Sequence, residues 1–170
     1  MPNSLKHIVR FILFVLVQGL VVGQIEFGMG IHPLIYPLFI LLLPFDMRPI
    51  IIMLIAFACG LSIDFMMNTF GLHASAAVFV AYFRPQLYRL FSPRDGYDVM
   101  KEPTLQEWGY KWFLSVTSTT VFLHHLWFFA LEIFKTSEWW NILKSTFLSA
   151  IISLVLMLIT QILFFKKEKL

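Results

Sequence analysis

The chain has 170 residues, of which 59% are hydrophobic and only 14% are charged, and its mean hydropathy is +0.79. Soluble domains are about 45–50% apolar and about 25% charged, so this chain lacks the ionic surface that a soluble globule of its size needs. A soluble enzyme domain is therefore excluded. Six spans of about 20 residues would leave only about 50 residues for loops and ends. The composition predicts one membrane domain over residues 1–170.

The net charge of +3 comes from thirteen Lys and Arg residues against ten Asp and Glu residues. The basic residues lie at the edges of apolar runs, which is typical of topology signals and not of a nucleic-acid-binding patch. We therefore expect a lipid bilayer around the chain and no nucleic-acid partner.

Apolar runs separated by turn signals predict an all-α integral membrane protein with six transmembrane helices in one compact bundle. The expected spans are about 8–25, 27–45, 49–67, 72–91, 112–134 and 140–165. The run 27–45 is ambiguous, because its prolines at 33, 37 and 44 predict an irregular start and a sharp stop. Residues 92–111 form the only long polar stretch.

The distribution of basic residues indicates that the run 27–45 crosses the membrane. With six spans and an inside N-terminus, ten Lys and Arg residues fall in inside segments and only Lys135 and Lys144 fall in outside segments. Without that span the polar stretch and the basic tail would lie outside, which reverses the bias. The positive-inside rule therefore predicts that both termini are cytoplasmic.

Asp64 is the most informative single residue, because a carboxylate near the end of an apolar helix is costly. It shares a stripe with Ala56 and Gly60, and a matching stripe of alanines on the next helix predicts close helix contact. Asp64 either caps the turn at 68–71 or belongs to a pocket or proton site. We expect no ion pair with Arg84, which lies about 18 Å below the turn at 1.5 Å per residue.

Other polar residues suggest interfaces at the two membrane surfaces. Arg84 and Arg89 are expected to anchor the fourth span at the cytoplasmic headgroups. A group near the outer surface either lines an outward-facing cavity or consists of ordinary loop-end residues; it contains Glu26, His32, Asp64, His73 and Glu132.

Small residues on two spans predict helix contacts. Gly19 and Gly23 form a GxxxG element, which indicates close contact with another helix of this chain or of a partner. Ser145, Ser149 and Ser153 form a similar stripe on the last span.

No catalytic motif occurs in the sequence: there is no P-loop, no H-E-x-x-H and no G-x-S-x-G. His124 and His125 are adjacent, so on a helix they point about 100° apart and cannot share a metal ligand face. We expect no enzymatic activity, no cofactor and no metal site.

The stretch GLSIDFMMNTFGLHA at residues 60–74, followed by FRP at 83–85, resembles the rod shape-determining protein MreD family of bacteria. The matching motif positions are Gly60, Asp64 and Gly71. A proline-bearing second span and a length near 170 residues are also similar to that family. The resemblance implies a fold similar to the S-components of energy-coupling-factor vitamin transporters.

The same resemblance implies a non-enzymatic scaffold of the cell-elongation complex in the bacterial inner membrane. Its partners would be the bitopic protein MreC, the peptidoglycan synthase pair RodA and penicillin-binding protein 2, and the MreB cytoskeleton. Gly19 and Gly23 are the expected contact for the MreC helix. The alternative is a substrate-binding transporter subunit, but the first span, residues 8–25, contains no alanine for the Ala-x-x-x-Ala pattern of such subunits.

Overall fold

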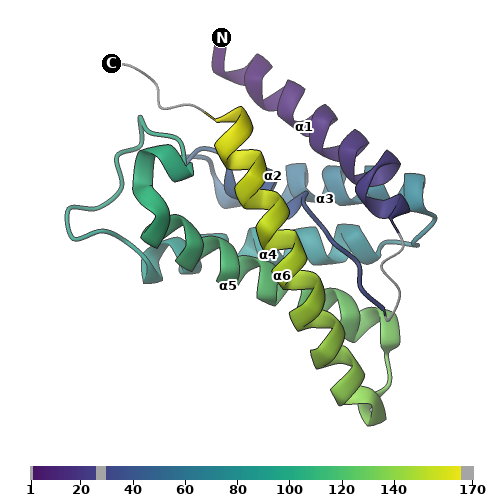
Figure 1. Cartoon of the computed structure of the whole chain (residues 1–170). Coiled ribbons are helices and arrows are strands. Elements are labelled where there is room, and N and C mark those ends of the chain that lie inside the picture. Colours follow the sequence, from purple (N-terminus) through teal and green to yellow (C-terminus); the bar gives the residue numbers. More distant parts are fainter. Residues whose placement is uncertain (1, 26–29, 166–170) are drawn as a thin grey trace.

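The computed structural model describes residues 2–25 and 30–165, and in these ranges the chain is helical and contains no strand (Figure 1). Four helices are long and apolar enough to cross a membrane: α1 (Pro2–Leu20), α3 (Pro49–Met67), α5 (Leu105–Ile133) and α6 (Trp139–Phe164). These four helices indicate a membrane protein. A fifth long helix, α4 (Leu72–Leu90), has the same 19-residue length as α3 but carries Arg84 and Arg89.

The run predicted as a second helical span, 27–45, is not a continuous helix, which corrects that prediction. Residues 31–35 are non-helical, and α2 (Pro37–Leu41) is only five residues long. The prolines explain the interruption, because each removes a backbone N–H and restricts the residue before it. Residues 33–43 are nevertheless all buried, so the irregular backbone lies inside the protein, where polar side chains can bond it.

Gln18 of α1 bonds the non-helical segment 31–35 from one side. Its Nε2 donates to the carbonyl of Pro33 (3.3 Å), and its Oε1 accepts from the N–H of Ile35 (2.8 Å). Gln18 is fully buried, so one side chain supplies both a donor and an acceptor where no backbone partner exists.

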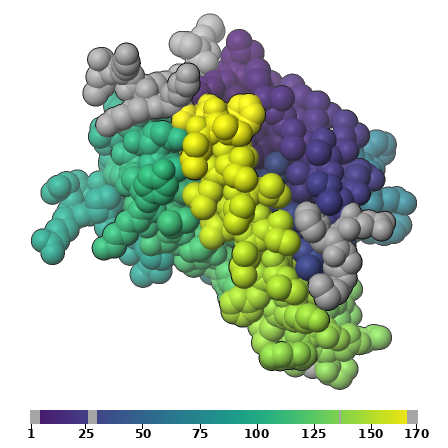
Figure 2. All heavy atoms as spheres, viewed as in Figure 1, coloured from purple at the N-terminus to yellow at the C-terminus, as the bar shows by residue number. Residues whose placement is uncertain are grey.

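The serine stripe of α6 bonds the same segment from another side. The Ser149 hydroxyl accepts from the N–H of His32 (2.9 Å), and the Ser153 hydroxyl accepts from the N–H of Leu34 (2.8 Å). In Figure 2, α6 lies at the front with α1 on one side and α5 on the other. The stripe is therefore an internal contact that holds irregular backbone, which is how membrane proteins tolerate such segments.

Arg84 holds the other end of the run. Its Nη2 donates to the carbonyls of Leu41 (3.3 Å), Leu43 and Pro44 (3.3 Å), which follow or end α2. Only 2% of Arg84 is exposed, so the expectation that it extends to the headgroups is wrong. The reason is that the carbonyls at the end of α2 lack intrahelical partners. The Arg84 guanidinium donates hydrogen bonds to these carbonyls. Arg89, one turn further on, is exposed.

Helices α3 and α4 form a close antiparallel pair, as their small residues predicted. Ala56 and Gly60 on α3 are buried, as are Ala74 and Ala77 on α4. A Cβ atom placed on Gly60 would lie 2.6 Å from the backbone nitrogen of Ala74. The absence of a side chain at Gly60 therefore sets the spacing of this helix pair.

Arg10 joins the polar loop to the end of α6 at one end of the bundle. Lys6 and Arg10 of α1 each lie 2.8 Å from a carboxylate oxygen of Glu102 in that loop. The Arg10 guanidinium also lies 4.7 Å from the ring centre of Phe165, just after α6. Figure 1 accordingly shows the beginning of α1 and the end of α6 at the same end of the molecule.

Helix α5 begins earlier than expected, at Leu105 instead of residue 112. Thr104 caps its start by accepting from the N–H of Glu107, and Gly109 interrupts it with a φ of 78°. Aromatic rings from the α2–α3 connection, α4, the polar loop and α5 pack together beside this break; they are Phe45, Tyr88, Tyr97, Trp108 and Trp112.

Candidate functional site

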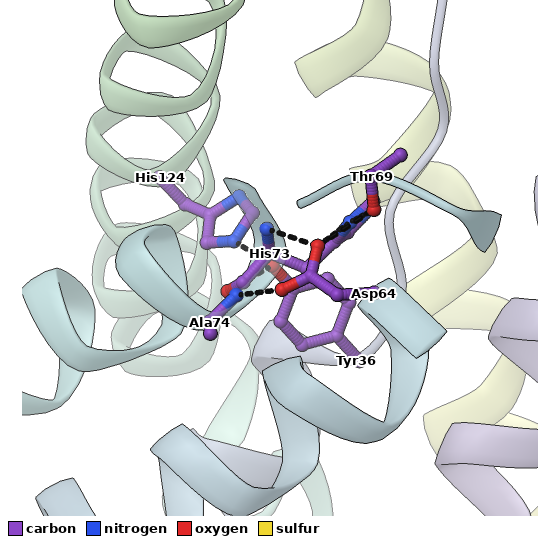
Figure 3. Close-up of polar contacts among 6 residues, drawn as sticks. All are labelled: Tyr36, Asp64, Thr69, His73, Ala74 and His124. Carbon is purple, nitrogen blue, oxygen red and sulfur yellow. Dashed lines mark hydrogen bonds and ion pairs between the residues drawn. The ribbon is translucent and has the colours of Figure 1, made fainter. Parts of the chain in front are cut away.

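Asp64 lies in the last turn of α3 and caps the beginning of α4 (Figure 3). Its carboxylate accepts hydrogen bonds from the backbone N–H groups of His73 (3.0 Å) and Ala74 (2.8 Å) and from the hydroxyl of Thr69 (2.6 Å). Acids are favourable at a helix N-terminus, where the first N–H groups lack partners. The capping interpretation is confirmed, and the hydrogen-bond partners of Asp64 do not include Arg84.

The turn between α3 and α4 depends on residues with a left-handed backbone. Asn68 ends α3 with a φ of 61°, and Gly71 precedes α4 with a φ of 91°. Gly71 adopts this conformation without a steric penalty because it has no Cβ. The three motif residues therefore support one joint between α3 and α4. Gly60 allows the close helix spacing, Asp64 caps α4, and Gly71 allows the turn.

His73 joins this unit through its ring. Its Nδ1 lies 3.1 Å from Asp64 Oδ1 and 2.9 Å from the Thr69 hydroxyl. Because the carboxylate only accepts and the Thr69 proton is already donated to Asp64, Nδ1 of His73 is the protonated nitrogen. Nε2 of His73 has no hydrogen-bond partner in the described part of the chain.

Tyr36 and His124 extend the polar network into the centre of the bundle (Figure 3). The Tyr36 hydroxyl lies 3.2 Å from the carbonyl oxygen of His73 and 2.6 Å from Nε2 of His124. Since a carbonyl can only accept, Tyr36 donates to His73 and accepts from His124. All three side chains are buried, so this network fixes the packing of the proline-broken segment against α4 and α5.

A cavity of about 450 Å³ lies beside His73 at this end of the bundle. His32, His73 and Glu132 line it together with Thr69 and Phe128. Three of the five residues predicted for an outer cavity thus share one. Asp64 does not line the cavity itself, but it bonds Thr69 and His73, which do. Glu26 lies outside the described residues.

Gly19 and Gly23 contact α3 of the same chain, which is one of the two contacts that the GxxxG element predicted, and this corrects the assignment of the MreC contact to them. A Cβ atom on Gly19 would lie 2.8 Å from Sδ of Met66, and one on Gly23 would lie 2.7 Å from Cε of Met67. The GxxxG element is therefore used inside the chain.

The adjacent histidines of α5 point to different neighbours, as the helix geometry predicted. His124 bonds Tyr36, whereas His125 lies 2.8 Å from the carbonyl of Val121 and 3.1 Å from the Ser153 hydroxyl. Within the described residues, no group of three or more His, Cys, Asp and Glu side chains is arranged to hold a metal ion.

Several residues of this network were not predicted from the sequence. Tyr36 and Thr69 carried no signal of their own, because a single hydroxyl in an apolar run does not indicate its partner. Gln18 does carry a signal: it is an amide within an apolar span, and buried amides require partners.

Comparison with known proteins provides no further assignment. No protein-family model, no curated protein and no solved structure matches the chain.

Proposed function

We propose that the chain is a non-enzymatic scaffold of the bacterial rod-shape complex that associates in the inner membrane with an MreC-like bitopic protein. The observation that best supports this is the role of the motif that resembles the MreD family. Gly60, Asp64 and Gly71 act together in the joint between α3 and α4. These motif residues have structural roles and do not form a reaction centre, and such roles are consistent with a scaffold protein.

The outward surface of the bundle offers apolar faces for a partner helix. Phe57, Leu61 and Phe65 are exposed on α3, and Phe147, Ile151 and Val155 are exposed on α6. Gly19 and Gly23 are occupied by α3, so we assign the MreC contact to one of these exposed faces. Through MreC the scaffold would act with RodA, penicillin-binding protein 2 and MreB, with both of its termini in the cytoplasm.

Co-purification and depletion test this proposal. The tagged full chain, extracted in a mild detergent, should recover MreC, and depletion should turn rod-shaped cells round. Photo-crosslinkers at exposed Phe57 and Ile151 should capture MreC at one of the two sites, whereas a crosslinker at buried Gly19 should not. If MreC is not recovered and depleted cells remain rods, the scaffold function is wrong.

The cavity beside His73 favours a second candidate, a substrate-binding subunit of a small-molecule transporter with a fold similar to the S-components. Such a subunit would need an ATPase-driven partner. Recovery of an ATPase complex, together with ATP-dependent uptake by the reconstituted pair, would favour this candidate over the scaffold. The lack of alanine in residues 8–25 argues against it.

A further inference from the structure

We propose that the cavity beside His73 binds an ammonium group, carried either by a small soluble amine or by a lipid headgroup. The cavity is formed by residues 22–25 after α1, the segment 30–34, the end of α3 with the turn that follows it, and facing residues of α4 and α5. Its volume of about 450 Å³ falls in the range of about 300–1,000 Å³ that small-molecule sites occupy.

The charge of the cavity favours a cation. Glu132 is the only charged residue among the described residues that line it. Lys135, one turn further along the chain, lies 3.8 Å from Glu138 instead. Glu132 makes no ion pair with another described residue, so its carboxylate is available to a ligand.

His73 adds a buried hydrogen-bond acceptor. Only 1% of His73 is exposed, and Nδ1 holds the proton that faces Asp64 and Thr69. In the neutral ring Nε2 then carries a lone pair, and it has no partner among the described residues. A buried polar atom without a partner is costly, and an N–H of a bound ammonium group would satisfy it.

The remaining walls favour a ligand with an apolar portion. Phe128 lies 5.0 Å from His73, ring centre to ring centre, and His32 packs 6.4 Å from Phe128. Aromatic faces attract cations and apolar groups. The apolar lining residues are Val22, Ile25, Ile31, Leu34 and Met67.

The inference is independent of the scaffold function, because ligand binding and recovery of MreC are separate measurements. Two sources can supply the ammonium group. One is a soluble primary amine, and the other is the headgroup of phosphatidylethanolamine, which carries a primary ammonium. Phosphatidylcholine is the informative control, since its quaternary ammonium has the same charge but no N–H to donate.

The soluble source is tested by calorimetry with the full chain in phosphatidylglycerol nanodiscs. Phenethylamine should bind, and 3-phenylpropionate, which has a similar shape and the opposite charge, should not. Glu132→Gln should weaken phenethylamine binding about tenfold or more, because the hydrogen bond between two charged groups is lost. Glu138→Gln, at the same end but outside the cavity lining, should leave binding unchanged.

His73→Asn tests the acceptor separately. Asparagine offers an amide N–H to Asp64 but has no group at the position of Nε2, so the cap is retained while the acceptor is lost. We expect weaker phenethylamine binding with a thermal unfolding temperature close to that of the parent chain. If the variant does not fold, Glu132→Gln still decides the outcome.

The lipid source is tested by thermal unfolding in nanodiscs of different composition. Phosphatidylethanolamine should raise the unfolding temperature above its value in phosphatidylcholine, and Glu132→Gln should remove the difference. Binding of phenethylamine would support the proposal with a soluble amine as the source. Stabilisation by phosphatidylethanolamine would support it with a lipid headgroup as the source. The proposal is wrong if neither amine binds, or if binding is unchanged by Glu132→Gln.

Discussion

The carboxamide oxygen of Gln18 accepts a 2.8 Å hydrogen bond from the main-chain N–H of Ile35. This bond joins the last turn of α1 to the non-helical segment 31–35. The amide nitrogen of Gln18 completes the pairing at Pro33. The Gln18 side chain thus supplies one donor and one acceptor to this backbone, as the main chain of a neighbouring strand would.

Replacing Gln18 should destabilise the bundle. In Gln18→Leu the N–H of Ile35 stays buried without a partner, and an unsatisfied buried group costs about 1–3 kcal/mol. We expect a loss of that size in the free energy of unfolding, measured by denaturant titration in detergent. Gln86→Leu, at an exposed position of α4, should have little effect, and equal losses in the two variants would contradict this role.

The sequence predicted the helices better than it predicted the segment between α1 and α3. Long apolar runs such as α3 are defined by length and composition, and α3 has the predicted bounds, 49–67. The run 27–45 has the composition of a span, but its prolines break the helix. Its actual path depends on bonds from Gln18 and Arg84, and such distant partners cannot be identified from local patterns.

Arg84 should stabilise the broken segment from its other end. Arg84→Met keeps the length and apolar stem of the side chain but leaves the carbonyls of Leu43 and Pro44 without their donor. We expect a loss of about 1–3 kcal/mol in unfolding free energy, with Arg84→Lys in between. Arg89→Met provides the matched control on the exposed side of α4. An Arg84→Met chain as stable as the control would mean that the guanidinium bonds contribute nothing net.

The candidate site was predictable where one helix and one turn determine it. Asp64 lies next to its own turn, so its cap followed from the sequence. The cavity was harder to predict from the sequence, because His32, His73 and Glu132 come from three separate segments. The sequence indicated only that these residues share the outer third, and their convergence depends on how α4 and α5 pack.

Gly60 and Gly19 should differ in their tolerance of a methyl group. A Cβ on Gly60 would meet backbone atoms of Ala74, whereas a Cβ on Gly19 would meet mainly the flexible end of Met66. Gly60→Ala should therefore separate α3 from α4 and cost about 1–3 kcal/mol, the range for overpacking. Gly19→Ala should cost clearly less in the same denaturant titration. A reversed order would show that Met66 cannot move and that the α1–α3 contact is the tighter one.

Glu102 should make the bundle sensitive to acid. Burial alone would raise the pKa of Glu102, but hydrogen bonds from Arg10 and Lys6 outweigh it, so the pKa lies below its ordinary value of 4.5. A carboxyl with a lowered pKa stabilises the folded state above its unfolded pKa, and this contribution is lost as the pH falls through the folded pKa. The unfolding temperature should therefore decline on acidification below about pH 4.5.

Glu102→Gln isolates this effect from general acid denaturation. The variant should be less stable than the parent chain at pH 7, and the difference between them should shrink as the pH falls below 4.5. Glu138→Gln, at the opposite end of the bundle, should follow the parent curve. Glu102 joins the polar loop to α1 through two ion pairs. Backbone amide exchange at positions 101 and 102 should therefore be faster in Glu102→Gln than in the parent chain at neutral pH. A constant difference between Glu102→Gln and the parent at every pH would mean that the ion pairs do not set the acid response.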